Sequence, residues 1–422
     1  MNKLLFSILF FGIFFLAVDF YFWQAFKSNF LLSVKLSPFI KWAYWMVSFL
    51  VLCLLFYCLS TYKNPEAPKY LIVVMAFIIS LFLAKLVACF PLLIDDFIRL
   101  LKWIYSWISV PFKETPAAHK ISRSTFLKNT SLVSAALFFG IMSWGIIVGR
   151  FNYKKHRIKL SLRKWPKALN GLKIIQISDL HLGSFTNTQP VEDIVALINE
   201  EKADLVLFTG DLVNSNYWEA TAFIPHLAKI KATYGKYSVM GNHDYADYIG
   251  IDKKSTAGLQ EWNDNFNNFK KVNQQMGFDL LLNQNKEIQI GAASFNLIGV
   301  ENWGAGGFSK YGDFDKAISG LHPDKCSILL SHDPSHWDAQ VRKHSFPIDL
   351  QLSGHTHGMQ FGIELGSFKW SPAKYRYPQW AGLHTKNTKN LYVNRGLGHL
   401  GYAGRVGIYP EITVFNIHSL EA

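Results

Sequence analysis

The chain has 422 residues, a length that suits two or three domains. Half of its residues are apolar and only 17% are charged, against a usual charged share of roughly 25%. This composition excludes an intrinsically disordered protein and indicates a membrane part. The four cysteines in such a long chain also exclude a scaffold that depends on disulfide bonds.

The net charge of +13 is concentrated in the first part of the chain. Residues 1–170 contain 21 Lys or Arg and 5 Asp or Glu, a balance of +16, whereas residues 171–422 have a balance of −3. A nucleic-acid-binding protein would carry its positive charge on a globular domain, so we expect no nucleic-acid partner. Positive charge beside apolar segments suits the headgroups of anionic membrane lipids instead.

Residues 1–149 are predicted to form a domain of about four transmembrane helices, each needing ~20 apolar residues to cross the bilayer. The candidate spans are residues 4–26, 38–59, 70–94 and 132–148. The third span contains Lys85, which has to reach the interface or face another helix because an ammonium group in lipid is costly. Residues 95–112 mix apolar and basic side chains, a composition that suits the membrane interface.

Residues 150–170 hold eight basic residues and predict a juxtamembrane linker before a globular domain at residues 171–422. An even number of spans puts both chain termini on one side of the membrane. The two sides then carry 11 and 9 Lys or Arg, which the positive-inside rule cannot separate. Residues 122–128 resemble a twin-arginine export motif in which Ser124 replaces the second arginine. This pattern favours an extracytoplasmic globular domain in a multi-pass protein of the plasma or inner membrane.

Five short apolar runs in the globular part are each followed at once by His, Asp or Asn. These strand-like runs are residues 172–177, 205–208, 237–240, 328–330 and 350–352. A helical pattern over residues 191–200 lies between the first two and completes a βαβ unit. Ligands bind where the strands of such sheets end at their carboxyl edge, so we expect the following polar residues to converge. They are Asp179, His181, Asp211, Asn242, His332, His355 and His357.

The chemistry of the converging groups predicts a metal site. Carboxylates and imidazoles without thiolates suit Mn, Fe, Zn or Ni and argue against a structural zinc site. Seven ligands exceed the needs of one ion, so we expect two divalent ions ~3.5–4 Å apart that share a bridging carboxylate. His355 and His357 are two residues apart, and on extended backbone their side chains would point the same way. His243 is a candidate acid, and Asp244 is the carboxylate expected to orient it.

In chain order, these motifs (D-x-H, G-D, G-N-H-D, H and G-H-x-H) resemble those of the calcineurin-like metallophosphoesterase superfamily. Residues 177–183, 395–398, 405 and 410–412 resemble its YkuE-type membrane-associated bacterial branch. The resemblance implies a four-layer α/β/β/α sandwich with a dinuclear metal centre at the strand ends. It places Asp179, His181 and His357 on one ion. It places Asn242, His332 and His355 on the other, with Asp211 as the bridge.

The resemblance also implies an enzyme, an integral-membrane phosphohydrolase in which a metal-bound hydroxide attacks phosphorus and His243 assists the leaving oxygen. The membrane helices favour a phosphorylated substrate at the bilayer surface, such as a lipid-linked phosphodiester or pyrophosphate. Two alternatives stay open: a phosphatase for soluble phosphate esters with the helices as a tether, and a non-enzymatic membrane sensor or scaffold. Arg395 and Arg405 are candidate substrate-binding residues, although pairing with acidic side chains would explain them equally well.

Overall fold

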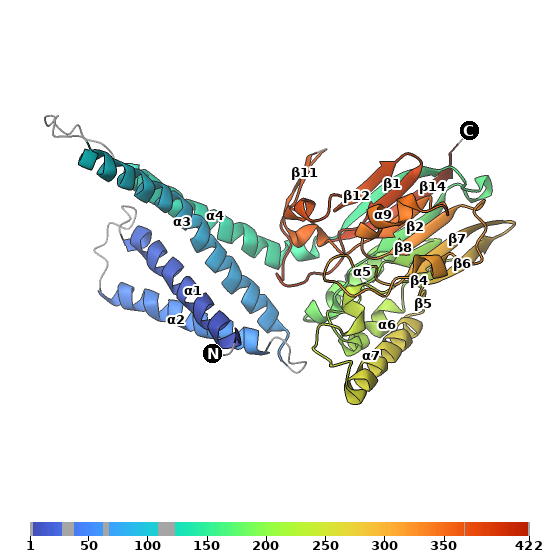
Figure 1. The fold of residues 1–422 in the computed structure, drawn as a ribbon, viewed down its shortest axis with the longest axis horizontal. Coiled ribbons are helices and arrows are strands. Elements are labelled where there is room, and N and C mark those ends of the chain that lie inside the picture. Colours follow the sequence, from blue (N-terminus) through green and yellow to red (C-terminus); the bar gives the residue numbers. More distant parts are fainter. Residues whose placement is uncertain (1–2, 28–37, 62–66, 109–122, 367, 421–422) are drawn as a thin grey trace. The chain divides into compact units, whose positions relative to one another are not determined.

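The structure of the protein is a computed structural model that describes residues 3–27, 38–61, 67–108, 123–366 and 368–420. The chain divides into two compact units, Met1–Ile146 and Ile147–Ala422, whose elements are labelled in Figure 1. Parts of two predicted segments, residues 109–112 and Ser122, lie outside the described residues.

The first unit consists of long apolar helices. They are α1 (Lys3–Lys27), α2 (Pro38–Thr61), α3 (Tyr70–Ile108) and α4 (Arg123–Ile147). Among the described residues, three stretches are long and apolar enough to cross a membrane, Phe39–Thr61, Tyr70–Tyr105 and Phe126–Phe151, and the described apolar stretch of α1 is Phe10–Phe26. The expected interface segment is no separate element as far as it is described, because α3 continues without a break to Ile108.

Lys85 faces another helix, which was one of the two arrangements expected for a charge in lipid. Its ammonium group forms an ion pair with Asp19 of α1, and the Asp19 side chain is fully buried. The Tyr44 hydroxyl of α2 donates to the Asp19 carbonyl oxygen at 3.0 Å. Because an unpaired charge at this depth would be costly, the pair ties the three helices together.

The second unit contains two six-stranded sheets and one short hairpin. The first sheet has the order β1 (Lys154–Leu162), β14 (Glu411–Ser419), β2 (Leu172–Ile177), β3 (Leu205–Phe208), β4 (Lys236–Ser238), β5 (Asp279–Leu280). The second has the order β12 (Gly382–Lys386), β13 (Lys389–Val393), β9 (Leu350–Ser353), β8 (Ser327–Ser331), β7 (Ala293–Val300), β6 (Gln284–Ile290). The hairpin pairs β10 (Ile363–Leu365) with β11 (Phe368–Trp370). The five predicted strands correspond to β2, β3, β4, β8 and β9.

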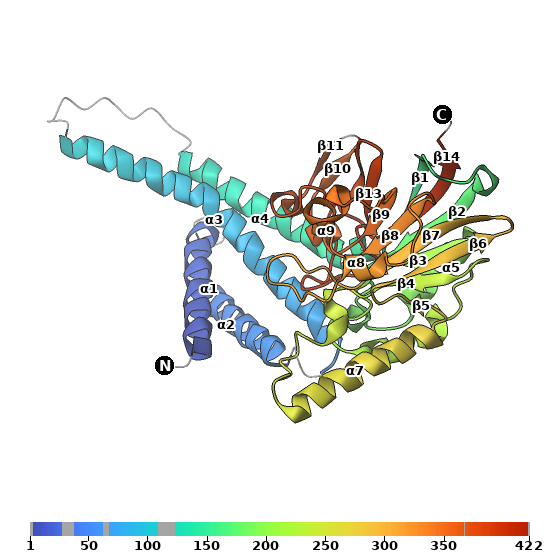
Figure 2. The same cartoon turned by 45° about the vertical axis from the view of Figure 1, so that its right-hand side comes forward.

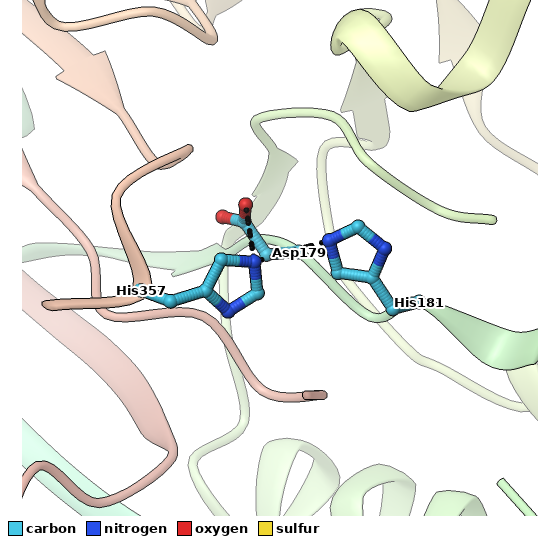
Figure 3. A group of neighbouring side chains, drawn as sticks. All are labelled: Asp179, His181 and His357. Atoms are coloured by element: carbon cyan, nitrogen blue, oxygen red, sulfur yellow. Dashed lines mark hydrogen bonds and ion pairs between the residues drawn. The ribbon is translucent and has the colours of Figure 1, made fainter. Parts of the chain in front are cut away.

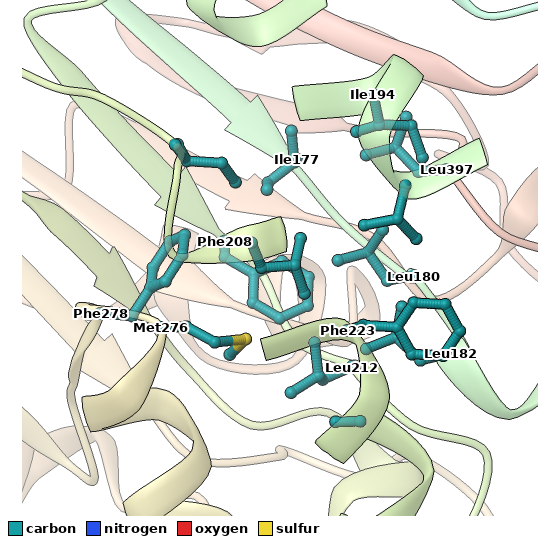
Figure 4. Packing of buried hydrophobic residues seen from close by; sticks show 14 of the residues in the cluster. Ile177, Leu180, Leu182, Ile194, Phe208, Leu212, Phe223, Met276, Phe278 and Leu397 are labelled. Carbon is teal, nitrogen blue, oxygen red and sulfur yellow. The ribbon is translucent and has the colours of Figure 1, made fainter. Parts of the chain in front are cut away.

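Alternation along the strands builds the four expected layers. In β2, Ile174 points into the cluster between the sheets, and Ile175 points into the outer cluster beneath the helices. The outer face of the first sheet packs on α5 (Gln189–Glu200) and α7 (Thr256–Gln275), and Figure 4 shows part of this cluster. The outer face of the second sheet packs on α8 (Phe314–Ala317) and α9 (Ser335–Ala339). In two views α7 lies beside β5 (Figure 1, Figure 2), and α6 (Ile224–Leu227) contacts α5. The α/β/β/α prediction is confirmed.

The prediction of a linker at residues 150–170 is wrong over most of its length. Residues 154–162 form β1, which pairs in parallel with β14 at the edge of the first sheet. Leu160 and Leu162 are buried, whereas the basic residues between the apolar ones face outward. Arg157 forms an ion pair with Glu201 at 2.7 Å. The basic run is therefore the solvent face of an edge strand, where charge discourages pairing with another chain.

Candidate active site

The predicted ligands all lie in loops that leave the carboxyl ends of the central strands. Asp179 and His181 follow β2, Asp211 follows β3, Asn242 follows β4, His332 follows β8, and His355 and His357 follow β9. Neighbouring loops bond to one another, since Asp179 N donates to Gly210 O at 2.9 Å. The two sheets thus bring residues that are nearly 180 positions apart to one edge.

The first group consists of Asp179, His181 and His357, and Figure 3 shows their side chains meeting. His357 Nε2 lies 3.2 Å from Asp179 Oδ1 and 3.0 Å from His181 Nε2. All three residues are buried. Two imidazole nitrogens and a carboxylate oxygen aimed at one point form a typical set of ligands for a divalent transition metal.

The second group consists of Asp211, His332 and His355. His332 Nε2 lies 3.1 Å from Asp211 Oδ2 and 3.2 Å from His355 Nδ1. The same Asp211 oxygen lies 3.5 Å from His181 Nε2, which belongs to the first group. One carboxylate oxygen therefore faces ligands of both groups, and this is the position that a bridging ligand requires.

The surroundings of Asn242 show whether this region suits a bound cation. The residue is 1% exposed, and its Oδ1 has no hydrogen-bond partner among the described residues, while its Nδ2 donates to the Tyr248 hydroxyl at 2.8 Å. An unsatisfied buried oxygen is destabilising, and a metal ion would satisfy it. Gly241 allows this turn to approach Asp211, because a Cβ there would lie 2.2 Å from Asp211 Oδ1.

Hydrogen bonds on the far side of two rings fix which nitrogen can bind a metal. His332 Nδ1 donates to the Thr209 carbonyl oxygen at 2.8 Å, and His181 Nδ1 donates to Asn214 Oδ1 at 3.2 Å. Both acceptors can only accept, so the proton of each neutral ring lies on Nδ1. The Nε2 lone pairs then face the cluster, as in metal sites whose outer partners orient the histidines.

The electrostatics of the cluster favour bound cations. Burial lowers the pKa of His181 well below its usual range, and it lowers the pKa of His355 to about 4 with the help of the charge on His332. Although burial opposes it, the Asp211 carboxylate raises the pKa of His332 to about 10. A buried carboxylate needs a cationic partner. For Asp211, either a protonated His332 or a divalent ion can supply this positive charge.

The loop backbone is strained at the predicted ligands. Asp179, His181, Asp211, His355 and His357 all have positive φ, between 47° and 72°. Such conformations cost of order 1–3 kcal/mol each and collect at functional sites. They correct our expectation of an extended backbone at His355 and His357. The left-handed turn sends these side chains to different groups, His355 to the second and His357 to the first.

Comparison with known proteins shows which family the chain belongs to. A family model described as "Calcineurin-like phosphoesterase" matches residues 172–359, and one described as "Probable Calcineurin-like phosphoesterase, transmembrane domain" matches residues 3–150. The chain is 33% identical over 313 residues to the uncharacterized metallophosphoesterase YkuE of Bacillus subtilis, covering 71% of this chain and 99% of YkuE. The chain belongs to the calcineurin-like metallophosphoesterase family. It is therefore a membrane-associated, metal-dependent phosphoesterase that acts on phosphorylated substrates.

Two other relatives have named activities. The UDP-2,3-diacylglucosamine pyrophosphatase LpxG of Chlamydia trachomatis is 28% identical over 281 residues, which cover 57% of this chain and 82% of LpxG. The phosphodiesterase YaeI of Escherichia coli is 27% identical over 303 residues, which cover 70% of this chain and 99% of YaeI. Both names describe hydrolysis at phosphorus, in agreement with the family.

In this metallophosphoesterase, Asp244 does not orient His243 as we expected. The Asp244 carboxylate accepts backbone N–H groups of Gly241, Asp211 and Leu212, each at 2.9 Å, and so ties the loop of Asp211 to its own. Burial and the Asp211 charge raise the pKa of Asp244 to about 8. His243 Nδ1 donates instead to the Asn214 carbonyl oxygen at 2.6 Å. This bond leaves Nε2 of the half-buried His243 ring available to a substrate.

Arg395 is not placed to bind substrate in this metallophosphoesterase. It is 1% exposed and forms ion pairs with Glu364 and Glu411, so the alternative of pairing with acidic side chains is correct. Arg405 is also fully buried, and it donates to the Gly398 carbonyl oxygen with Nη2 only 3.2 Å from His357 Nδ1. Arg405 therefore lies behind His357 and has no access to substrate.

Removal of Arg395 is expected to destabilise the protein. A lone Glu411 charge would remain buried, so Arg395→Ala should cost ~3–5 kcal/mol and lower the thermal unfolding midpoint. Arg342→Ala removes a surface i,i+4 pair with Asp338 and should cost ~1 kcal/mol or less. Although burial opposes it, Arg395 lowers the pKa of Glu411 to about 2 from 4.5. This stabilisation is present above pH 4.5 and is lost as the pH falls toward 2. Equal midpoints for the two variants at pH 7 would contradict this assignment.

The sequence reasoning missed two residues that hold the site of this phosphoesterase. Asn214 fixes His181 with its side chain and His243 with its carbonyl group. Its place three residues after Asp211 in the same loop was a usable signal. The Tyr377 hydroxyl lies 2.8 Å from His355 Nε2. Burial and Asp333 raise the pKa of Tyr377 to about 12. Tyr377 lies in a long loop rich in aromatic residues, and no motif marks it.

Proposed function

We propose that this phosphoesterase hydrolyses a phosphoester or pyrophosphate bond with two divalent ions, such as Mn, Fe or Zn. Asp179, His181 and His357 would hold one ion, and Asn242, His332 and His355 the other. The position of Asp211 Oδ2, between His181 and His332, carries the proposal, because it is where a shared ligand would lie. The buried and unsatisfied Asn242 oxygen supports the second site.

The protein side chains suit phosphoryl chemistry around such ions. Bound divalent ions supply positive charge and Lewis acidity at the phosphoryl group. His243 can donate a proton from Nε2 to the leaving oxygen, since Asn214 holds its other nitrogen. The His243 ring lies 4.9 Å from the His181 ring, next to the ligand groups. The backbone N–H of His243 also donates to Asp211 Oδ1 at 2.9 Å, so this bond holds the proposed acid next to the proposed bridging carboxylate.

We further propose a substrate at the bilayer surface, with a lipid-linked phosphodiester or pyrophosphate as the leading class. The apolar helices of the first unit support this, since a tethered enzyme meets membrane substrates at high effective concentration. The similarity to LpxG, whose name gives it a diacylglucosamine-linked nucleotide, supports the same class. A soluble phosphate ester is the alternative.

Activity of the full-length protein in detergent micelles tests the proposal. We expect turnover of bis-p-nitrophenyl phosphate with Mn²⁺ that EDTA abolishes and added metal restores. A panel of lipid-linked pyrophosphates and soluble phosphomonoesters then separates the two substrate classes. Absence of turnover with Mn²⁺, Fe²⁺ and Zn²⁺ on every substrate would contradict an enzyme and favour a sensor or scaffold.

The side of the membrane is a separate prediction. We expect residues 171–422 on the extracytoplasmic side, because the export-like residues 122–128 favour the cytoplasm for the loop before the fourth predicted span. That loop would then hold Arg99, Lys102, Lys113, Lys120, Arg123 and Lys128 beside anionic lipid. Each such charge near anionic lipid contributes ~1 kcal/mol. Alkaline phosphatase and green fluorescent protein fused after Ala422 would report the side. Fluorescence of the second fusion without phosphatase activity of the first would place the domain in the cytoplasm.

A further inference from the structure

An exposed arginine, Arg376, stands beside the second ligand group. It follows the short 3-10 helix η9 (Pro372–Tyr375). Its guanidinium carbon lies 5.1 Å from the centre of the Phe308 ring and 5.6 Å from that of Tyr377. Both rings touch His355, with ring centres 4.7 Å and 5.3 Å from the imidazole. The Phe308 ring and the Tyr377 ring therefore each lie between the Arg376 guanidinium and His355, a candidate metal ligand.

The charge of Arg376 is not neutralised by the protein. Within the described part of the chain, no carboxylate forms an ion pair with it, whereas Lys253 is paired with Asp247 at 2.7 Å. Arg395 is occupied by two glutamates. Aromatic rings that flank a guanidinium hold its plane. The Tyr377 hydroxyl interacts with the Arg376 side chain, and the other N–H groups of the guanidinium can bind an anion. Arg376 is thus able to bind a phosphate group of the substrate, the role for which Arg395 and Arg405 were candidates from the sequence.

We propose that Arg376 binds a second phosphoryl group of the substrate, next to the phosphoryl group that reacts at the ligand cluster. The guanidinium fork matches two phosphate oxygens. Because Phe308 and Tyr377 fill the space between Arg376 and His355, the arginine is placed to reach a neighbouring phosphoryl group and not the one in contact with the ligands. The inference rests on the proposed function and narrows its substrate class to diesters of pyrophosphate.

Two matched substrates and the full-length protein with Mn²⁺ test this subsite. Bis-p-nitrophenyl phosphate has one phosphoryl group, and P1,P2-di(4-nitrophenyl) pyrophosphate has the same aryl groups and two. A charge-assisted hydrogen bond contributes ~1.5–3 kcal/mol, so Arg376→Gln should raise KM for the pyrophosphate about 10- to 100-fold with little change in kcat. Kinetics on the monophosphate diester and the metal content should stay as in the wild type. Arg376→Lys should restore part of the affinity.

Lys374→Gln is the matched control. Lys374 is an exposed cation two residues before Arg376, and its ammonium group lies over the Tyr375 ring. The substitution removes the same charge and should leave both substrates unaffected. Equal losses on the two substrates, no loss on either, or wild-type turnover of the monophosphate diester alone would overturn the subsite. Failure of the wild type on both substrates would instead contradict the proposed function.

Discussion

Asp211→Asn is expected to abolish turnover and to lower the metal content of the protein. Asp211 is 1% exposed, and one of its oxygens faces both His181 and His332. Two dications at a shared ligand need a negative charge between them, and a neutral amide cannot supply it. The amide N–H₂ would also meet the backbone N–H of His243, which now donates to Asp211 Oδ1, or a metal position. The variant should retain one ion or none.

Metal analysis by mass spectrometry, together with bis-p-nitrophenyl phosphate hydrolysis, measures this effect. Asp349→Asn is the matched control, because Asp349 is also a buried carboxylate but precedes β9, at the end of the sheet opposite the ligand loops. It should keep both metal and activity. Two bound ions with full activity in Asp211→Asn would disprove the dinuclear proposal, whereas loss of folding in circular dichroism would require Asp211→Glu as the test.

His243→Ala is expected to keep the metal and lose rate by ~10²–10⁴-fold, the usual contribution of a general acid. His243 Nδ1 is committed to the Asn214 carbonyl, and the residue belongs to neither ligand group. A good leaving group needs no proton, so the loss should be smaller for nitrophenyl esters than for alkyl esters.

Parallel assays of nitrophenyl and alkyl phosphodiesters measure this dependence. His344→Ala serves as the control, since the half-buried His344 belongs to neither ligand group; it pairs with Asp315 at 3.1 Å and accepts the Phe346 N–H at 3.0 Å. An equal loss on both ester types would assign His243 to electrostatic stabilisation. Loss of metal would make it a ligand.

The sequence predicted the strands and the ligand loops because both depend on local patterns. A short apolar run followed by a polar residue marks the end of a buried strand, and parallel strands such as β2 and β3 then bring those ends together. The family resemblance assigned His355 and His357 to different ions, but the left-handed backbone that separates their side chains was not predicted. Sequence spacing does not reveal such strain, since the surrounding loops impose it.

Contacts between distant segments explain the other differences. Glu411 and Glu364, the partners of Arg395, lie 16 and 31 residues away, so its burial could not be read locally. The Asn214 carbonyl that holds His243 belongs to the neighbouring loop. The basic residues of β1 looked like a linker because their strand partner is β14, at the other end of the chain.

That pairing has a consequence for how the protein is made. β14, which is synthesised after every other described strand, lies inside the first sheet between β1 and β2. Lys154 pairs with Glu411 across roughly 250 residues, a span that takes a ribosome about 10–50 s to translate. Until then the first sheet cannot close, and such distant pairing slows folding. Until β14 has been translated, the nascent domain therefore remains attached to its membrane helices with β1 unpaired and accessible to chaperones and proteases. Deletion of β14 would leave the domain in that state.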